Sequence, residues 1–162
     1  MKNIQFKYLP LFCIQIYISL HLIEEGYFGF PKWVQTRWGI PKFDMEMWLS
    51  HNYYFIFYLI LGWSFYYVNE KKLLSLGLGI LVWGFLNFLN HAVFSIIFIE
   101  YSPGLLSSFI FLLLFVLGLQ KLKELKLLNT KLLLMGTLSG ALYWILPIGS
   151  FLFVDIILLG KG

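Results

Sequence analysis

The chain has 162 residues, of which 60% are hydrophobic, 20% aromatic and only 12% charged, with a formal net charge of +4 at pH 7. A soluble domain averages about 45–50% apolar and about 25% charged residues. One small core cannot hide this excess, because a domain of about 150 residues still exposes close to a third of its unfolded surface. The composition therefore excludes a cytosolic enzyme and a nucleic-acid-binding protein. A single cysteine, Cys13, also excludes an intrachain disulfide framework.

Five apolar segments are long enough, or nearly so, to cross a bilayer, which takes about 17–25 helical residues. They run over Tyr8–Phe28, Tyr53–Val68, Leu73–Ile99, Gly104–Leu119 and Lys131–Gly160. The long connection Phe30–Asn52 is interpreted as an external loop, and no internal repeat divides the chain. The sequence therefore predicts an all-α fold, a polytopic transmembrane helical bundle that forms a single domain over residues 1–162.

Lysine and arginine residues in the connections predict the orientation, because short cytoplasmic loops carry an excess of them. With a cytoplasmic N-terminus, the inner side holds eight: Lys2, Lys7, Lys71, Lys72, Lys121, Lys123, Lys126 and Lys131. The outer side then holds four: Lys32, Arg37, Lys42 and Lys161. In this topology the external loop is expected to place three aromatic side chains among the outer headgroups: Trp33, Trp38 and Trp48. The matching inner belt is expected to consist of Trp63, Tyr66 and Tyr67.

Ionisable side chains within the spans are informative, because each costs about 2.5–3.5 kcal/mol at the middle of a membrane. In the predicted topology they all fall in the outer half: His21, Glu24, Glu25, His91 and Asp155, with His51 at the start of the second span. Ionisable residues without a shared role would be expected in both leaflets. Asp155 is close enough to the outer surface to be solvated, and His51 is expected to be an interfacial residue.

Helix geometry groups these residues further. His21 and Glu25 are four residues apart and share one helix face, as do Asn87 and His91 on another helix. If the two faces meet, His21, Glu25 and His91 converge, with Glu24 and Asn87 at the rim.

Three chemistries fit such a cluster. Two imidazoles and one carboxylate with an open fourth position form a ligand set of catalytic zinc. We therefore predict one divalent metal ion on His21, Glu25 and His91, with Glu24 as the general base for a bound water. Zinc is favoured over iron, because di-iron bundles draw carboxylates from four helices. The other two chemistries are metal-free acid–base catalysis and a proton or cation path. A Glu–His pair that only fastens two helices is the purely structural explanation.

Four short elements then follow one another along the chain: His21-Leu22-Ile23-Glu24-Glu25, Pro31 with Trp33, Asn87-Phe88-Leu89-Asn90-His91, and Tyr101-Ser102-Pro103-Gly104. In these elements the chain resembles the HXXEE family of small bacterial membrane proteins of unknown function, over about Leu20 to Leu106. The resemblance implies a multi-span protein of a bacterial cell membrane and supplies no reaction. It singles out His21, Glu24, Glu25, Asn87, His91 and Tyr101. The turn at Pro103 and Gly104 would hold Tyr101 at the rim above His91.

Together these observations favour a membrane-embedded, metal-dependent enzyme of hydrolase or transferase type. It would act at the outer leaflet on a lipid or amphipathic substrate, with Glu24 and Tyr101 as catalytic residues. A small proton-coupled transporter that titrates Glu24 and Glu25 is one alternative. A non-catalytic membrane interaction protein, in which the polar cluster only locks the bundle, is another. The expected partner is the lipid bilayer and not a nucleic acid.

Overall fold

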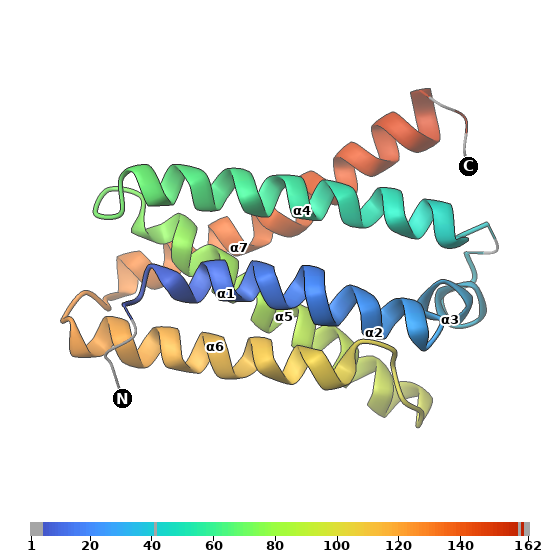
Figure 1. The fold of residues 1–162 in the computed structure, drawn as a ribbon, viewed down its shortest axis with the longest axis horizontal. Helices are drawn as coiled ribbons and strands as arrows, with labels where there is room; N and C mark the ends of the chain where they lie inside the picture. Colours follow the sequence, from blue (N-terminus) through green and yellow to red (C-terminus); the bar gives the residue numbers. More distant parts are fainter. Residues whose placement is uncertain (1–4, 41, 159, 161–162) are drawn as a thin grey trace.

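The structure is a computed structural model, which describes residues 5–40, 42–158 and 160. These residues are mostly helical, which confirms the predicted all-α class (Figure 1). The elements in chain order are α1 (Tyr8–Ile16), the π-helical η1 (Tyr17–His21), α2 (Leu22–Tyr27), α3 (Phe30–Arg37), α4 (Met45–Val68), α5 (Leu74–Phe98), α6 (Leu105–Glu124), α7 (Thr130–Phe151) and the π-helical η2 (Leu152–Leu158). In Figure 1, α4, the continuous α1–η1–α2 helix and α6 lie in front, and α5 and α7 cross behind them.

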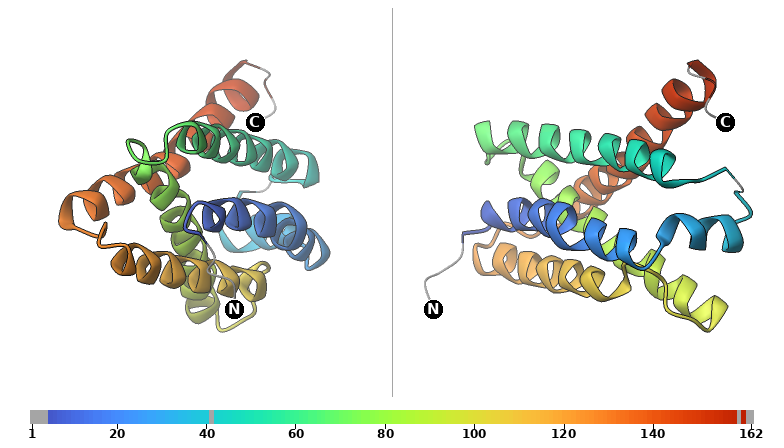
Figure 2. Two further views of the ribbon diagram at one scale, coloured as in Figure 1. Left: turned by 60° about the vertical axis from the view of Figure 1, so that its left-hand side comes forward. Right: turned by 45° about the vertical axis from the view of Figure 1, so that its right-hand side comes forward.

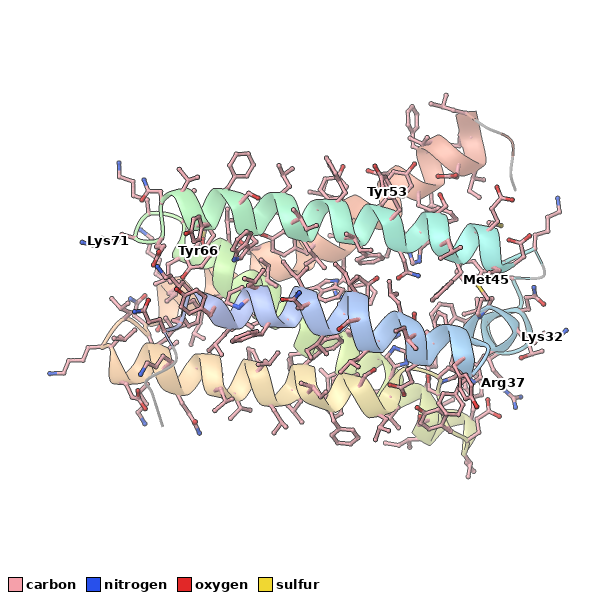
Figure 3. The ribbon with its side chains drawn as sticks, in the orientation of Figure 1. Lys32, Arg37, Met45, Tyr53, Tyr66 and Lys71 are labelled. Carbon is pink, nitrogen blue, oxygen red and sulfur yellow. The ribbon has the colours of Figure 1, made fainter. Side chains whose placement is uncertain are left out.

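Three of the described helices are long and apolar enough to cross a membrane: α5, α6 and the continuous α7–η2. The first predicted segment is also a continuous helix, from Tyr8 to Tyr27. Figure 3 shows Lys71 at one end of the bundle and Lys32 and Arg37 at the opposite end. The long helices therefore run between two surfaces that carry charged side chains.

The predicted external loop over Phe30–Asn52 is wrong in two places. Helix α3 occupies Phe30–Arg37, and α4 begins at Met45, about two turns before the predicted second span. The Asp44 carboxylate caps α4, because it accepts a hydrogen bond from the Met47 backbone N–H at 2.9 Å. The first turns of α4 are polar enough to be mistaken for a loop, although they continue the helix into the bundle.

Two of the expected headgroup aromatics are buried, so that prediction is also wrong for them. Trp33 donates its indole N–H to Glu100 Oε1 at 2.7 Å, and Trp48 donates its own to Glu25 Oε2 at 3.1 Å. Tyr66, expected in the inner belt, is buried against Gly77 of α5. These rings pack within the protein because other segments of the chain satisfy their polar atoms or cover their faces.

Close packing between α5 and α7 holds the centre of the bundle. A Cβ atom at Gly79 would lie 2.5 Å from the Cβ of Ser139, and one at Gly140 would lie 2.6 Å from Val82 Cγ1. Glycine at both positions lets the two backbones approach to a distance that a side chain would prevent. This contact fixes the position of α5, whose C-terminal half carries Asn87 and His91.

Candidate metal centre

The first helix supplies two of three polar side chains that meet inside the bundle. His21 is the last residue of the π-helical turn η1, and Glu25 lies one turn later in α2. Both side chains are buried, and His21 Nε2 lies 3.5 Å from Glu25 Oε1. π-Helical turns occur frequently at functional sites.

Helix α5 supplies the third side chain. His91 is buried, and its Nε2 atom lies 3.5 Å from the same Glu25 Oε1 atom. The three donor atoms lie within 4.8 Å of one another. The structure thus brings together His21, Glu25 and His91, the three side chains that helix geometry predicted to converge. We call them the His–Glu–His group.

Other polar side chains contact the second polar atom of each member of this group. His21 Nδ1 lies 2.9 Å from Ser107 Oγ, and His91 Nδ1 lies 3.0 Å from Ser102 Oγ. Trp48 donates to Glu25 Oε2, so Oε1 alone faces the two imidazoles. Sequence reasoning missed Ser102, Ser107 and Trp48 as parts of the site. The only signal was that Ser102 lies in the Tyr-Ser-Pro-Gly turn.

That turn lies directly against the imidazoles. Gly104 has a φ of +102°, and a Cβ atom there would lie 2.7 Å from His91 Cε1 and 2.8 Å from His21 Cε1. A side chain at this position would be strained and would fill the space beside both rings. The glycine therefore keeps room next to the Nε2 atoms.

The spacing within the group does not match hydrogen bonding. N–H···O bonds have heavy-atom distances of about 2.7–3.2 Å, whereas both Nε2···Oε1 distances are 3.5 Å. Among the residues that the structure describes, His21 Nε2 has no hydrogen-bond partner. Ligand atoms about 2.0–2.1 Å from a tetrahedral zinc ion would be about 3.3–3.4 Å apart. The two His–Glu distances are therefore close to those between metal ligands, and the three donor atoms, all within 4.8 Å of one another, could hold a metal ion.

A cavity of about 560 Å³ adjoins the group. Glu25, Asn87 and His91 line its polar side, and the other walls are mostly apolar side chains of α3, α4, α5, α7 and η2. Asn87 is only 6% exposed, and its Oδ1 atom has no hydrogen-bond partner within the described part of the chain. Asn87 was predicted at the rim of the cluster, and the structure places it in the cavity wall.

Glu24 and Tyr101 contact one another and the start of α6. Glu24 accepts hydrogen bonds from the backbone N–H groups of Leu106 and Ser107 at 3.0 and 2.7 Å, and from the Tyr101 hydroxyl. Partial burial, followed by this contact with Glu24, raises the pKa of Tyr101 to about 12, so its hydroxyl stays protonated at neutral pH. The structure brings neither residue into the His–Glu–His group.

The two remaining ionisable residues lie further along the bundle. The expectation that Asp155 is solvated is wrong, because it is buried in η2 and accepts a hydrogen bond from the Tyr54 hydroxyl at 2.9 Å. His51 lines the cavity, with its ring 5.0 Å from that of Phe55 and 5.2 Å from that of Phe151. His51 is therefore a wall of the cavity and not a member of the group.

Over residues 12–118 the chain is similar to a family described as proteins of unknown function with an HXXEE motif. This range includes the three members of the His–Glu–His group and both serines that contact its histidines. Searches of curated proteins and of solved structures found no match.

Proposed function

The chain belongs to the family of proteins of unknown function with an HXXEE motif, and we propose that it is an integral membrane enzyme with one zinc ion on the His–Glu–His group. The reaction is a hydrolysis or group transfer on a lipid or amphipathic substrate from the outer leaflet of a bacterial cell membrane. One observation carries the proposal: three buried donor atoms are spaced like metal ligands and adjoin a large apolar cavity.

The hydrogen bonds around His21 are compatible with a metal ion at this position. Ser107 Oγ lies 3.3 Å from the Gly104 carbonyl oxygen and 2.9 Å from His21 Nδ1. When Nδ1 carries the ring proton and donates it to Ser107, Nε2 has a lone pair that can bind a metal. This atom faces Glu25 Oε1 at 3.5 Å, so that a cation between the two would be attracted by both.

A purely structural role explains the same atoms poorly. A Glu–His pair that fastens two helices would close to hydrogen-bond distance. A buried carboxylate is also costly in an apolar interior unless a positive charge compensates it. The serine contacts on both Nδ1 atoms match the outer hydrogen bonds that orient metal-bound histidines.

Three protein ligands leave a fourth position for water or substrate. Zinc bound there would acidify a water molecule or polarise a substrate carbonyl. His21 and His91 hold their Nε2 atoms toward Glu25, while Trp48 fixes the carboxylate. Both carboxylate oxygens of Glu24 accept hydrogen bonds from backbone N–H groups at the start of α6, and Tyr101 also donates to Glu24. We therefore assign Glu24 to anchoring the turn above the group.

The proposed topology has five spans with the N-terminus in the cytoplasm. Helix α4 has 24 residues and is about 36 Å long, which is enough to cross a bilayer. The continuous helix from Tyr8 to Tyr27 supplies the remaining span beside α5, α6 and α7–η2. This orientation puts Lys71 inside and Arg37 outside, in agreement with the excess of basic residues at the inner end.

Elemental analysis tests the proposal directly. The protein is purified in mild detergent beside His21→Ala, His91→Ala and the control His51→Ala, which changes a histidine of the cavity wall outside the group. We expect about one zinc per chain in the wild type and the control, and none in the other two variants. Circular dichroism confirms that each variant is helical.

Folded wild-type protein that holds no metal after zinc supplementation would overturn the metal proposal. The remaining explanations of the cluster would then be a proton path and a Glu–His pair that only fastens two helices. Equal zinc in His91→Ala would show that a bound metal lies elsewhere.

A further inference from the structure

The cavity beside the His–Glu–His group has two chemically different sides. Glu25, Asn87, Asn90 and His91 form the polar side. Most of the other lining side chains are aromatic or aliphatic, and Lys42, His51 and Asn52 are the polar residues among them. An amphipathic ligand matches this division, with its polar group at the His–Glu–His group and its hydrocarbon part between α4 and α7.

The volume suits a long apolar chain. An apolar protein cavity of about 150 Å³ already holds a benzene molecule, and this cavity measures about 560 Å³. Pockets of about 300–1,000 Å³ bury most of the surface of a drug-sized ligand. A space of this size with mostly apolar walls favours hydrocarbon over a chain of water molecules.

The cavity reaches the surface at residues typical of a membrane interface. Trp38 and Ile40 of the α3–α4 connection line it and are about two-fifths exposed, and Leu152 of η2 lines it and is about half exposed. Figure 2 shows η2 diverging from the other helices beside the start of α4. A ligand can therefore reach the cavity sideways from the bilayer.

Asn87 specifies the polar group. Its Oδ1 atom is buried, lines the cavity and has no partner among the described residues. Leaving such an acceptor unpaired costs about 1–3 kcal/mol. Asn52, which lines the same cavity, is already satisfied, because it accepts from the Tyr17 hydroxyl and donates to the Trp48 carbonyl at 2.8 Å. Asn87 lies one turn from His91 on α5. Its Oδ1 atom therefore needs a hydrogen-bond donor from the ligand in the cavity.

We propose that the cavity binds an amphipath with a long hydrocarbon chain whose polar end carries a hydroxyl or an amide N–H, which donates to Asn87 Oδ1. An otherwise identical molecule that only accepts hydrogen bonds leaves Asn87 unpaired and binds more weakly. The inference deepens the proposed function by naming the substrate class of the same site, but binding of the chain does not itself require zinc.

Two matched probes test it: oleyl alcohol, which donates, and its methyl ether, which has the same chain and only accepts. Binding to the purified full-length protein is measured by native mass spectrometry in lauryldimethylamine oxide, a detergent without hydroxyl or N–H groups. We expect one oleyl alcohol per chain, bound at least 5-fold more tightly than the ether. In Asn87→Leu the two probes should bind equally.

Two α7 variants test the position. Ile148→Trp fills the cavity and should lose both probes, whereas Ile145→Trp points outward and should bind like the wild type. A third probe, 1-oleoylglycerol, distinguishes the source of the hydroxyl: tighter binding than oleyl alcohol indicates a lipid headgroup, and weaker binding indicates a free long-chain alcohol. Wild-type protein that binds alcohol and ether equally, or Ile148→Trp that still binds both, would overturn the inference.

Zinc content measured on the same samples separates this inference from the proposed function. Selective binding of oleyl alcohol by protein that holds no metal after zinc supplementation would overturn the zinc proposal alone. One zinc per chain with no preference for the alcohol would overturn the substrate class alone.

Discussion

The two halves of α5 have opposite surroundings. Its N-terminal half packs directly on α7, where Gly79 meets Ser139 and Gly140 with no space between the backbones. Its C-terminal half, with Asn87 and His91, faces the His–Glu–His group and a cavity of about 560 Å³. One helix therefore separates a closely packed contact that stabilises the fold from a polar, open region suited to binding.

The polar side chains at the C-terminal half of α5 are therefore not a consequence of loose folding. The same α5 helix is fixed by the close contact at one end, so the side chains at its other end are held against those of η1 and α2. Changes in one half should thus affect stability, and changes in the other should affect metal and ligand binding.

The largest expected effect comes from breaking the close contact. Gly79→Leu introduces a side chain where a Cβ atom alone would lie 2.5 Å from Ser139 Cβ and 3.1 Å from the Gly140 backbone N. Overpacking of this kind costs about 1–3 kcal/mol or more. We expect a marked fall in the thermal unfolding midpoint in detergent. Gly149→Ala on α7, where a Cβ atom meets nothing within 4 Å, is the control. Equal midpoints in the two variants would contradict the close contact.

The next largest effect concerns the surroundings of the His–Glu–His group and leaves all three proposed ligands in place. Ser107→Ala takes away the hydrogen-bond partner of His21 Nδ1, and loss of such an outer contact typically weakens metal affinity about 10–100-fold. Ser108→Ala is a matched control, because Ser108 Oγ donates to the Leu105 carbonyl of its own helix. Competition with a chelating dye measures both affinities. An unchanged affinity in Ser107→Ala, or an equal loss in Ser108→Ala, would count against the assigned contact.

Two adjacent acids should behave differently. Glu24→Ala removes the acceptor for two backbone N–H groups and the Tyr101 hydroxyl at the start of α6, and it should cost about 1–2 kcal/mol of stability. Zinc should remain at about one per chain, because Glu25 is intact. Glu124→Ala at the other end of α6 is the control, since the Glu124 side chain is 65% exposed and such ion pairs contribute little. Loss of zinc from Glu24→Ala would place Glu24 among the ligands.

The smallest effect concerns the attachment of α3. Arg37 donates to Glu100 and holds the pKa of that carboxyl below its usual range. A lowered folded-state pKa adds stability above the unfolded pKa of about 4.3, and this stability disappears as the pH falls through the lowered value. Hydrogen exchange of α3 amides, corrected for intrinsic rates, should therefore lose protection between pH 5 and strongly acidic conditions, by amounts on the order of those for exposed ion pairs.

Glu100→Gln provides the comparison for this pH effect. It should show lower α3 protection already at neutral pH, with little further change on acidification. A wild-type pH dependence that persists in Glu100→Gln would assign the effect to another group.

The core of the site could be predicted from sequence because its signals are local. The spacing of His21 and Glu25, that of Asn87 and His91, and the cost of charge in a membrane all follow from neighbouring residues. The long apolar helices followed in the same way from apolar length, whereas α3 and the first two turns of α4 did not. None of these features depends on how distant helices pack.

The remainder depends on packing between distant segments. Glu24 and Glu25 differ because the start of α6, about eighty residues later, lies beside one of them. Asp155 is buried because Tyr54 reaches it from another helix. Serine hydroxyls cost little in a membrane, so nothing in the sequence marked Ser107 as a site residue. The cavity volume depends on how α4 and α7 diverge.

The most direct test of the central claim is X-ray absorption spectroscopy at the zinc edge of the purified protein, compared with His91→Ala. We predict a first shell of nitrogen and oxygen atoms at about 2.0–2.1 Å, with outer scattering from two imidazoles that falls to one, or to no bound zinc, in the variant. A zinc shell that is identical in His91→Ala, or wild-type protein without imidazole scattering, would contradict a metal centre on His21, Glu25 and His91.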